Sequence, residues 1–222
     1  MHFRGFCGVI LLYFGGMETS LMAYSDWTLE TVKKAFQLEE VNAAGIFAEV
    51  DPVEPSTHLA TTLERNVPLA FAMGTEKAKS ELIVSAVLVE LWEHFDRGIS
   101  FFSGIDFNVD AENGLTGVCD FLVSLSPAQF HLEAPIIVLV EAKKDNLTVG
   151  LGQCVAEMIA AQRFNAESEN DTPCIYGAIT SGIDWIFLKL DGKRLQLDMA
   201  AYQIAQCDKI LGILASMVAQ KA

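Results

Sequence analysis

One stretch, Pro135 to Lys143, limits what this chain can fold into more than any other. Apolar residues run without a break from Ile136 to Val140, and a glutamate and a lysine follow, two positions apart. Such a short, largely β-branched run is typical of a central strand buried on both faces. Because strand side chains alternate, Glu141 and Lys143 point to one face. Charges in a buried strand are costly unless paired, hydrogen-bonded or bound to an ion, so this stretch indicates a site.

The chain of 222 residues is long enough for one substantial hydrophobic core. We expect a single α/β domain over residues 25–222, preceded by an N-terminal extension over residues 1–24. The apolar run at 8–14 in the extension is too short to span a membrane. It resembles a weak signal peptide, but translation that begins at Met17 or Met22 is the simpler interpretation.

Charge and cysteine content restrict the location and the partners. The formal net charge is -14, which disfavours generic binding to nucleic acid, because such affinity comes largely from Lys and Arg neutralising phosphates. The five cysteines form no C-x-x-C pair and the four histidines no H-x-x-x-H spacing. We therefore expect neither a zinc site nor a disulfide framework, and we expect a reducing, cytoplasmic location with no membrane association.

Hydrophobic periodicity and turn residues predict the other elements. Helices are expected at 27–38, 56–65, 75–95, 149–165 and 202–218. Strands are expected at 99–102, 105–109, 116–125, 135–143, 174–180, 184–190 and 194–197, and residues 39–55 are expected to be irregular. The strands on either side of the helix at 149–165 should pair in parallel, and the earlier strands should form an antiparallel meander. The expected fold is a mixed-sheet α/β sandwich.

A second acid, Asp120, interrupts the apolar strand at 116–125. Because the two strands are close in sequence, Asp120 is expected beside Glu141. Adjacent carboxylates repel, so one is protonated unless a cation lies between them, and oxygen ligands of this kind suit magnesium or manganese. Lys143 would face the same ion and hold an anionic substrate oxygen or the attacking water. The alternative is a buried ion pair with only a structural role.

The spacing of Asp120 and Glu141-Ala142-Lys143 resembles the PD-(D/E)XK nuclease superfamily, also called restriction-endonuclease-like. Glu81 in the first core helix and Gln153 in the helix after the lysine match two further positions of that family. Cys119 stands where the family name has proline, a position at which members often differ.

The resemblance covers about residues 75–190 and implies a mixed sheet flanked by helices with the core order αβββαβ. Residues 176–185 resemble the nuclease domain of type I restriction enzymes in particular.

What the resemblance implies is metal-dependent hydrolysis of phosphodiester bonds. Asp120 and Glu141 would hold Mg²⁺ or Mn²⁺, and Glu81 would hold a second ion or a metal-bound water. Lys143 would position the attacking water and stabilise developing charge, with Gln153 hydrogen-bonded near the site.

Three functions stay open. The first is a magnesium-dependent nuclease whose partner is nucleic acid, DNA favoured, in a homodimer if both strands are cut. The second is a non-catalytic member of the same fold that binds nucleic acid or a partner protein, which the acidic charge favours. The third is a hydrolase for another phosphoester. Glu81 has a simpler alternative as a residue that caps a helix, forms an ion pair or faces solvent, and Gln153 has a similar one. Glu157 is expected at the surface or as an ion-pair partner.

Overall fold

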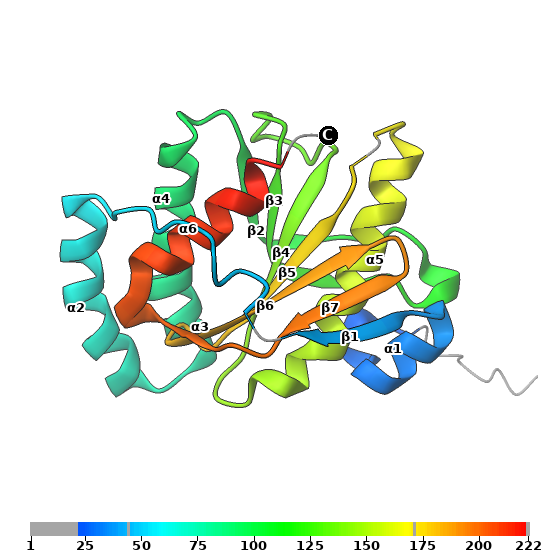
Figure 1. Ribbon diagram of the computed structural model, residues 1–222, viewed down its shortest axis with the longest axis horizontal. Helices are drawn as coiled ribbons and strands as arrows, with labels where there is room; N and C mark the ends of the chain where they lie inside the picture. Colours follow the sequence, from blue (N-terminus) through cyan, green and yellow to red (C-terminus); the bar gives the residue numbers. More distant parts are fainter. Residues whose placement is uncertain (1–21, 44, 171, 221–222) are drawn as a thin grey trace, which may run out of the picture.

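A computed structural model describes residues 22–43, 45–170 and 172–220. Within these residues the architecture is α/β, with a mixed eight-stranded sheet between two layers of helices (Figure 1). The strand order is β1-β7-β6-β5-β4-β3-β2, and β8 pairs with β6. The strands are β1 Glu39–Ala43, β2 Ser100–Asp106, β3 Val118–Ser124, β4 Ile136–Ala142, β5 Ile175–Thr180, β6 Asp184–Asp191, β7 Arg194–Asp198 and β8 Tyr202–Gln203.

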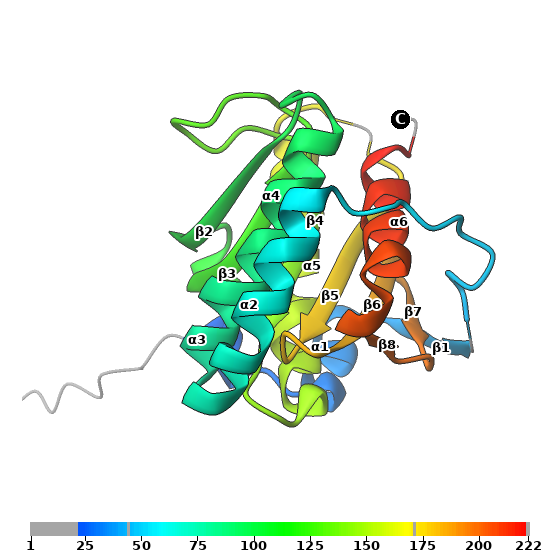
Figure 2. The ribbon, with the colours of Figure 1, turned by 90° about the vertical axis from the view of Figure 1, so that its left-hand side faces the viewer.

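Helices cover both faces of the sheet. They are α1 Leu29–Phe36, α2 Thr57–Met73, α3 Glu76–Lys79, α4 Ser85–His94, α5 Leu151–Glu167 and α6 Cys207–Val218. Figure 2 shows α2, α4 and α6 in front of the sheet, with α1 and α5 behind it. A π-helical turn, η2 (Ser80–Val84), joins α3 to α4, and a 3-10 turn, η4 (Leu147–Gly150), precedes α5.

The expected central topology is confirmed. β4 is antiparallel to β3, and the chain then crosses through α5 to β5, which is parallel to β4. All seven residues of β4 are buried, because helices cover both of its faces. The apolar run at 136–140 therefore forms the strand on which the rest of the sheet is arranged.

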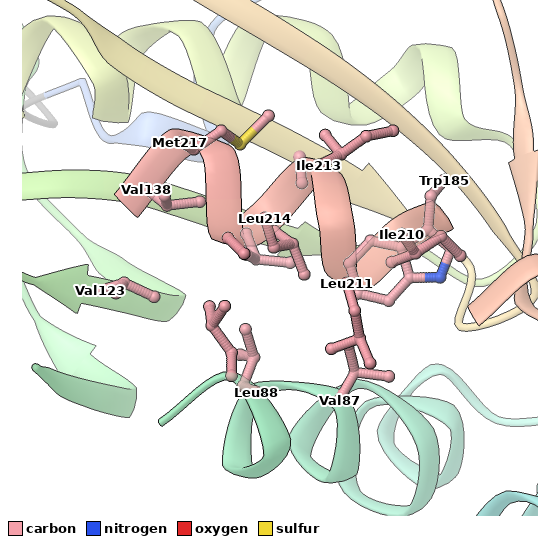
Figure 3. Close-up of a cluster of buried hydrophobic side chains, with 14 of the residues drawn as sticks. Val87, Leu88, Val123, Val138, Trp185, Ile210, Leu211, Ile213, Leu214 and Met217 are labelled. Carbon is pink, nitrogen blue, oxygen red and sulfur yellow. The ribbon is translucent and has the colours of Figure 1, made fainter. Parts of the chain in front are cut away.

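Two hydrophobic clusters fill the space on either side of the sheet. In the first, Leu88 of α4 and Leu211 and Leu214 of α6 pack with Val123 and Val138 of the sheet (Figure 3). The second lies between the sheet and α5. Tyr24 belongs to this second cluster, and its hydroxyl donates to the carbonyl of Phe107 at 2.7 Å. Tyr24 thus belongs to the folded domain, although the sequence analysis assigned it to the N-terminal extension. Residues 1–21 of that extension lie outside the described residues.

We expected residues 39–55 to be irregular, and this was wrong for the first five of them. Residues 39–43 form β1, which pairs in parallel with β7 at the edge of the sheet. The sequence Glu-Glu-Val-Asn-Ala has little β propensity, so the strand depends on a partner about 150 residues later in the chain.

Several element boundaries also differ from expectation. α2 continues through Pro68 to Met73 and does not end near Arg65. The two short strands expected at 99–102 and 105–109 are one strand, β2, which stays paired with β3 although Gly104 has a φ of 62°. The last helix begins at Cys207, because Tyr202 and Gln203 pair with β6.

The cysteines and the lengths of the helices bear on two further expectations, within the described residues. The four cysteines among them (Cys119, Cys154, Cys174 and Cys207) are free and buried. Of the helices in these ranges, none has the length and apolar character that crossing a membrane requires.

Candidate active site

The candidate site begins where β3 and β4 diverge. Phe121 and Val140 form the last pair of their ladder. Two residues beyond Val140, the backbone N–H of Ala142 donates to Oδ2 of Asp120 at 2.8 Å. The Asp120 carboxylate thus takes the place of a backbone acceptor, which fixes its orientation and leaves its second oxygen for other partners. Asp120 is partly exposed and lines a surface cleft.

Glu141 lies one position further along β4 and is only 1% exposed. Its Oε1 accepts a hydrogen bond from Nζ of Lys143, and its Oε2 is buried with no protein partner. Burial and then the charge of Asp120 raise the pKa of Glu141 to about 8, and the ammonium of Lys143 only partly opposes this. A bound cation would remove both costs, because it would pair with the unpartnered oxygen and screen the two carboxylates.

Lys143 lies between two acceptors, because Nζ contacts Glu141 and also donates to Oε1 of Gln153 at 3.3 Å. Burial acts to lower the pKa of Lys143, but the neighbouring carboxylates, Glu141 foremost, outweigh it and raise the pKa. The amine therefore stays a cation. Gly150 helps to place it, since a Cβ there would lie 3.1 Å from Cγ and Cε of the lysine.

The structure brings a further acid, Glu157, to this group. Nε2 of Gln153 donates to its Oε1 at 3.1 Å, one helical turn along α5. Glu157 is 0% exposed, and among the described residues its side chain contacts the amide of Gln153 and forms no ion pair, so the expectation of a surface residue or an ion-pair partner was wrong. The apolar residues around it, from Cys154 to Ala161, were the available indication, because a helix that is apolar on all sides is buried.

An open, polar cleft of about 230 Å³ lies beside Asp120. Ser103 and Gly104 of β2 form one of its other walls. The first residues of α3 and of η2 form another. Glu81 is on this wall, on the π-helical turn, and its side chain is 61% exposed and bound to Lys77 at 3.0 Å. Glu81 therefore shares the cleft with Asp120 but is already engaged in an ion pair.

Lys79 connects the wall of the cleft to the strand that carries the site. Its side chain is largely buried, and Nζ donates to the carbonyl of Lys144 at 2.6 Å and contacts Oδ1 of Asp145 at 3.4 Å. Sequence reasoning missed this residue, because a lysine in a mostly polar helical segment gives no indication of which loop it meets. The contact holds the chain just after Lys143 against α3.

The donor set of the candidate site is made of carboxylates, which are ligands suited to a divalent ion. Within the described ranges, no three His, Cys, Asp or Glu side chains group closely enough to hold a metal by themselves. The set does fit an ion that keeps several waters and takes one or two protein carboxylates, as magnesium does. Asp120 and Glu141 lie close together. Within the described residues, one oxygen of each carboxylate makes no hydrogen bond, and that of Glu141, Oε2, is buried.

A larger hollow of about 500 Å³ lies elsewhere, between the segment before α2 and the helices α4 and α6, with His58, Glu90 and His94 among its lining residues. Glu90 is already satisfied, since it accepts from the backbone N–H of Ser56 at 2.7 Å and from its hydroxyl at 2.8 Å. Among the described residues that line this hollow, no buried side-chain polar atom lacks a hydrogen-bond partner, so the β3–β4 site is the stronger candidate.

Comparison with protein-family models, with curated proteins and with solved structures found no match in any of the three. The functional assignment therefore depends on the geometry of the site.

Proposed function

We propose that this protein is a divalent-metal-dependent nuclease with a restriction-endonuclease-like core, which hydrolyses phosphodiester bonds of nucleic acid, with DNA favoured. The observation that carries the proposal is the convergence of Asp120, Glu141 and Lys143 at the diverging ends of β3 and β4, where Asp120 lines an open polar cleft. The order of elements from α3 to β5, helix, three strands, helix and strand, also supports it.

Each residue has a role in this proposal. Asp120 and Glu141 would hold Mg²⁺ or Mn²⁺, which when bound polarises the phosphate and lowers the pKa of a bound water. Lys143, a cation held by Glu141 and Gln153, would orient the attacking water and stabilise the charge that develops on the phosphate. Glu81, at the rim of the cleft, would exchange its contact with Lys77 for a second ion or a metal-bound water.

A second candidate is a non-catalytic member of the same fold that binds nucleic acid or a partner protein. The net charge of -14 favours it, because free DNA is repelled everywhere except at a local concentration of basic groups. A hydrolase for a smaller phosphoester is the third candidate, and the same residues would serve it.

The deciding experiment is cleavage of supercoiled plasmid and of single-stranded DNA with Mg²⁺ or Mn²⁺. We expect the wild type to cleave at least one substrate and Asp120→Ala and Lys143→Ala to lose at least about a hundredfold in rate, as expected when a group that stabilises developing charge is removed. Glu93→Ala and Lys193→Ala are matched controls on the surface, where each residue makes only an exposed contact.

Cleavage that survives in both site variants would overturn the assignment of the site. No cleavage of either DNA with either metal would overturn the DNA nuclease proposal and favour the binding module.

A further inference from the structure

Glu157 is an acid in a position where an apolar side chain would cost less. It is 0% exposed and its helical neighbours Cys154, Val155, Ala156 and Met158 are all 0% exposed as well. Only Oε1 has a hydrogen bond, and Oε2 is buried without a partner. Burial, followed by the charge of Glu141, raises the pKa of Glu157 well above its usual value. A half-satisfied buried carboxyl destabilises a fold, so its presence calls for a role other than packing.

Within the described residues, the single hydrogen bond of the Glu157 side chain leads to the candidate site. Oε1 accepts from Nε2 of Gln153 at 3.1 Å, and Oε1 of Gln153 accepts from Nζ of Lys143 at 3.3 Å. An amide has one donor end and one acceptor end, so the acceptor at Glu157 determines which end of Gln153 faces Lys143. With the amide reversed, an N–H would meet the ammonium and repel it.

We propose that Glu157 is a positioning residue, which holds the side-chain amide of Gln153 with its oxygen toward Lys143 and thereby places the Lys143 amine in the site. The part of this role that concerns hydrolysis rests on the proposed nuclease function, whereas the placement of Lys143 does not. Among the described residues, the hydrogen bond of the Glu157 side chain is to Gln153, so Glu157 acts on Lys143 through that amide and would not itself touch the substrate or the ion.

The test measures the placement of Lys143 directly, as its rate of acetylation by acetic anhydride under native conditions, read by mass spectrometry against the exposed Lys34. In the wild type Lys143 should react slowly, since its side chain is 19% exposed and held by two acceptors. Glu157→Met, which keeps an unbranched side chain but no acceptor, should raise the rate roughly fivefold, the factor for loss of one hydrogen bond. Glu157→Gln keeps an acceptor and should stay near the wild type.

Three further variants make the result decisive. Gln153→Met should reproduce the effect of Glu157→Met, and the double variant should show no additional change, because both substitutions break one chain of contacts. Gln162→Met, which removes an exposed amide contact on the same helix, should leave Lys143 unchanged. Thermal stability should not fall in Glu157→Met, because an apolar side chain replaces a half-satisfied buried acid.

Unchanged acetylation of Lys143 in Glu157→Met, or additive effects in the double variant, would overturn the positioning role. A loss of stability with no change at Lys143 would also overturn it and indicate a structural role. In the cleavage assay Glu157→Met should lose roughly tenfold in rate, as is typical when a residue that orients a functional group is removed. If the wild type cleaves no DNA, the nuclease function fails, and the acetylation result still decides the placement of Lys143.

Discussion

Among single residues, Glu141 is a carboxylate in an environment that disfavours its charge. Its folded pKa of about 8 lies above the usual value of 4.5, so between these values the folded state binds more protons than the unfolded state. The free energy of unfolding must therefore fall as pH rises through this window. The buried Glu157, whose pKa is also raised, acts in the same direction.

We predict that the metal-free protein loses on the order of 3–5 kcal/mol of stability through Glu141 between about pH 5 and about pH 8. Urea denaturation in EDTA across this range measures the loss. Glu141→Gln should flatten the dependence, and Glu93→Gln on the exposed face of α4 should leave it unchanged. When Mg²⁺ replaces EDTA, the wild type should lose less stability over the same pH range. Parallel curves for the wild type and Glu141→Gln would show that the Glu141 carboxyl is not the cause.

At the scale of elements, a buried asparagine joins α5 to the start of β4. Oδ1 of Asn165 accepts from the N–H of Ile136 at 2.8 Å, and its Nδ2 donates to the carbonyl of the same residue at 2.7 Å. Both residues are buried, with Asn165 2% exposed. The contact fixes the far end of the helix that carries Gln153, while Gly152 at the near end lets α5 approach the backbone of Trp27 and Thr28.

Asn165→Ala should therefore destabilise the fold by roughly 2–5 kcal/mol, because it leaves a buried donor and a buried acceptor of Ile136 unpaired. The shift of the urea midpoint measures this cost. Gln162→Ala on the same helix removes an amide whose single contact is exposed, and its cost should stay within about 1 kcal/mol. Equal shifts for the two variants would mean that water replaces the asparagine.

At the scale of the whole molecule, the acidic charge opposes the compact state. A net charge of -14 on 222 residues causes self-repulsion, which salt screens. Raising NaCl from about 50 to about 500 mM should raise Tm in EDTA by about 2–4 °C, which corresponds to roughly 1 kcal/mol for a chain of this size. Choline chloride at the same concentrations should raise Tm by the same amount, since screening depends on ionic strength. A shift with sodium alone, or a fall in Tm, would contradict the explanation.

The sequence by itself determined the central strand and the pair of charges at its end. The apolar run at 136–140 has no stable place except in a sheet covered on both faces, and strand alternation puts Glu141 and Lys143 on one side. The neighbouring strand and its acid, Asp120, followed from the short connection. These features depend on local periodicity and on contacts between elements that are close in the chain, which a sequence pattern records.

Only the tertiary structure decided the remainder. β1 exists because β7 pairs with it, Lys79 is buried because the loop after Lys143 accepts its amine, and Glu157 lies beneath the site because the sheet covers that face of α5. The cleft beside Asp120 depends on how η2 and β2 meet. Each involves partners far apart in sequence, and local propensity carries no information about which distant groups will pair once the chain is packed.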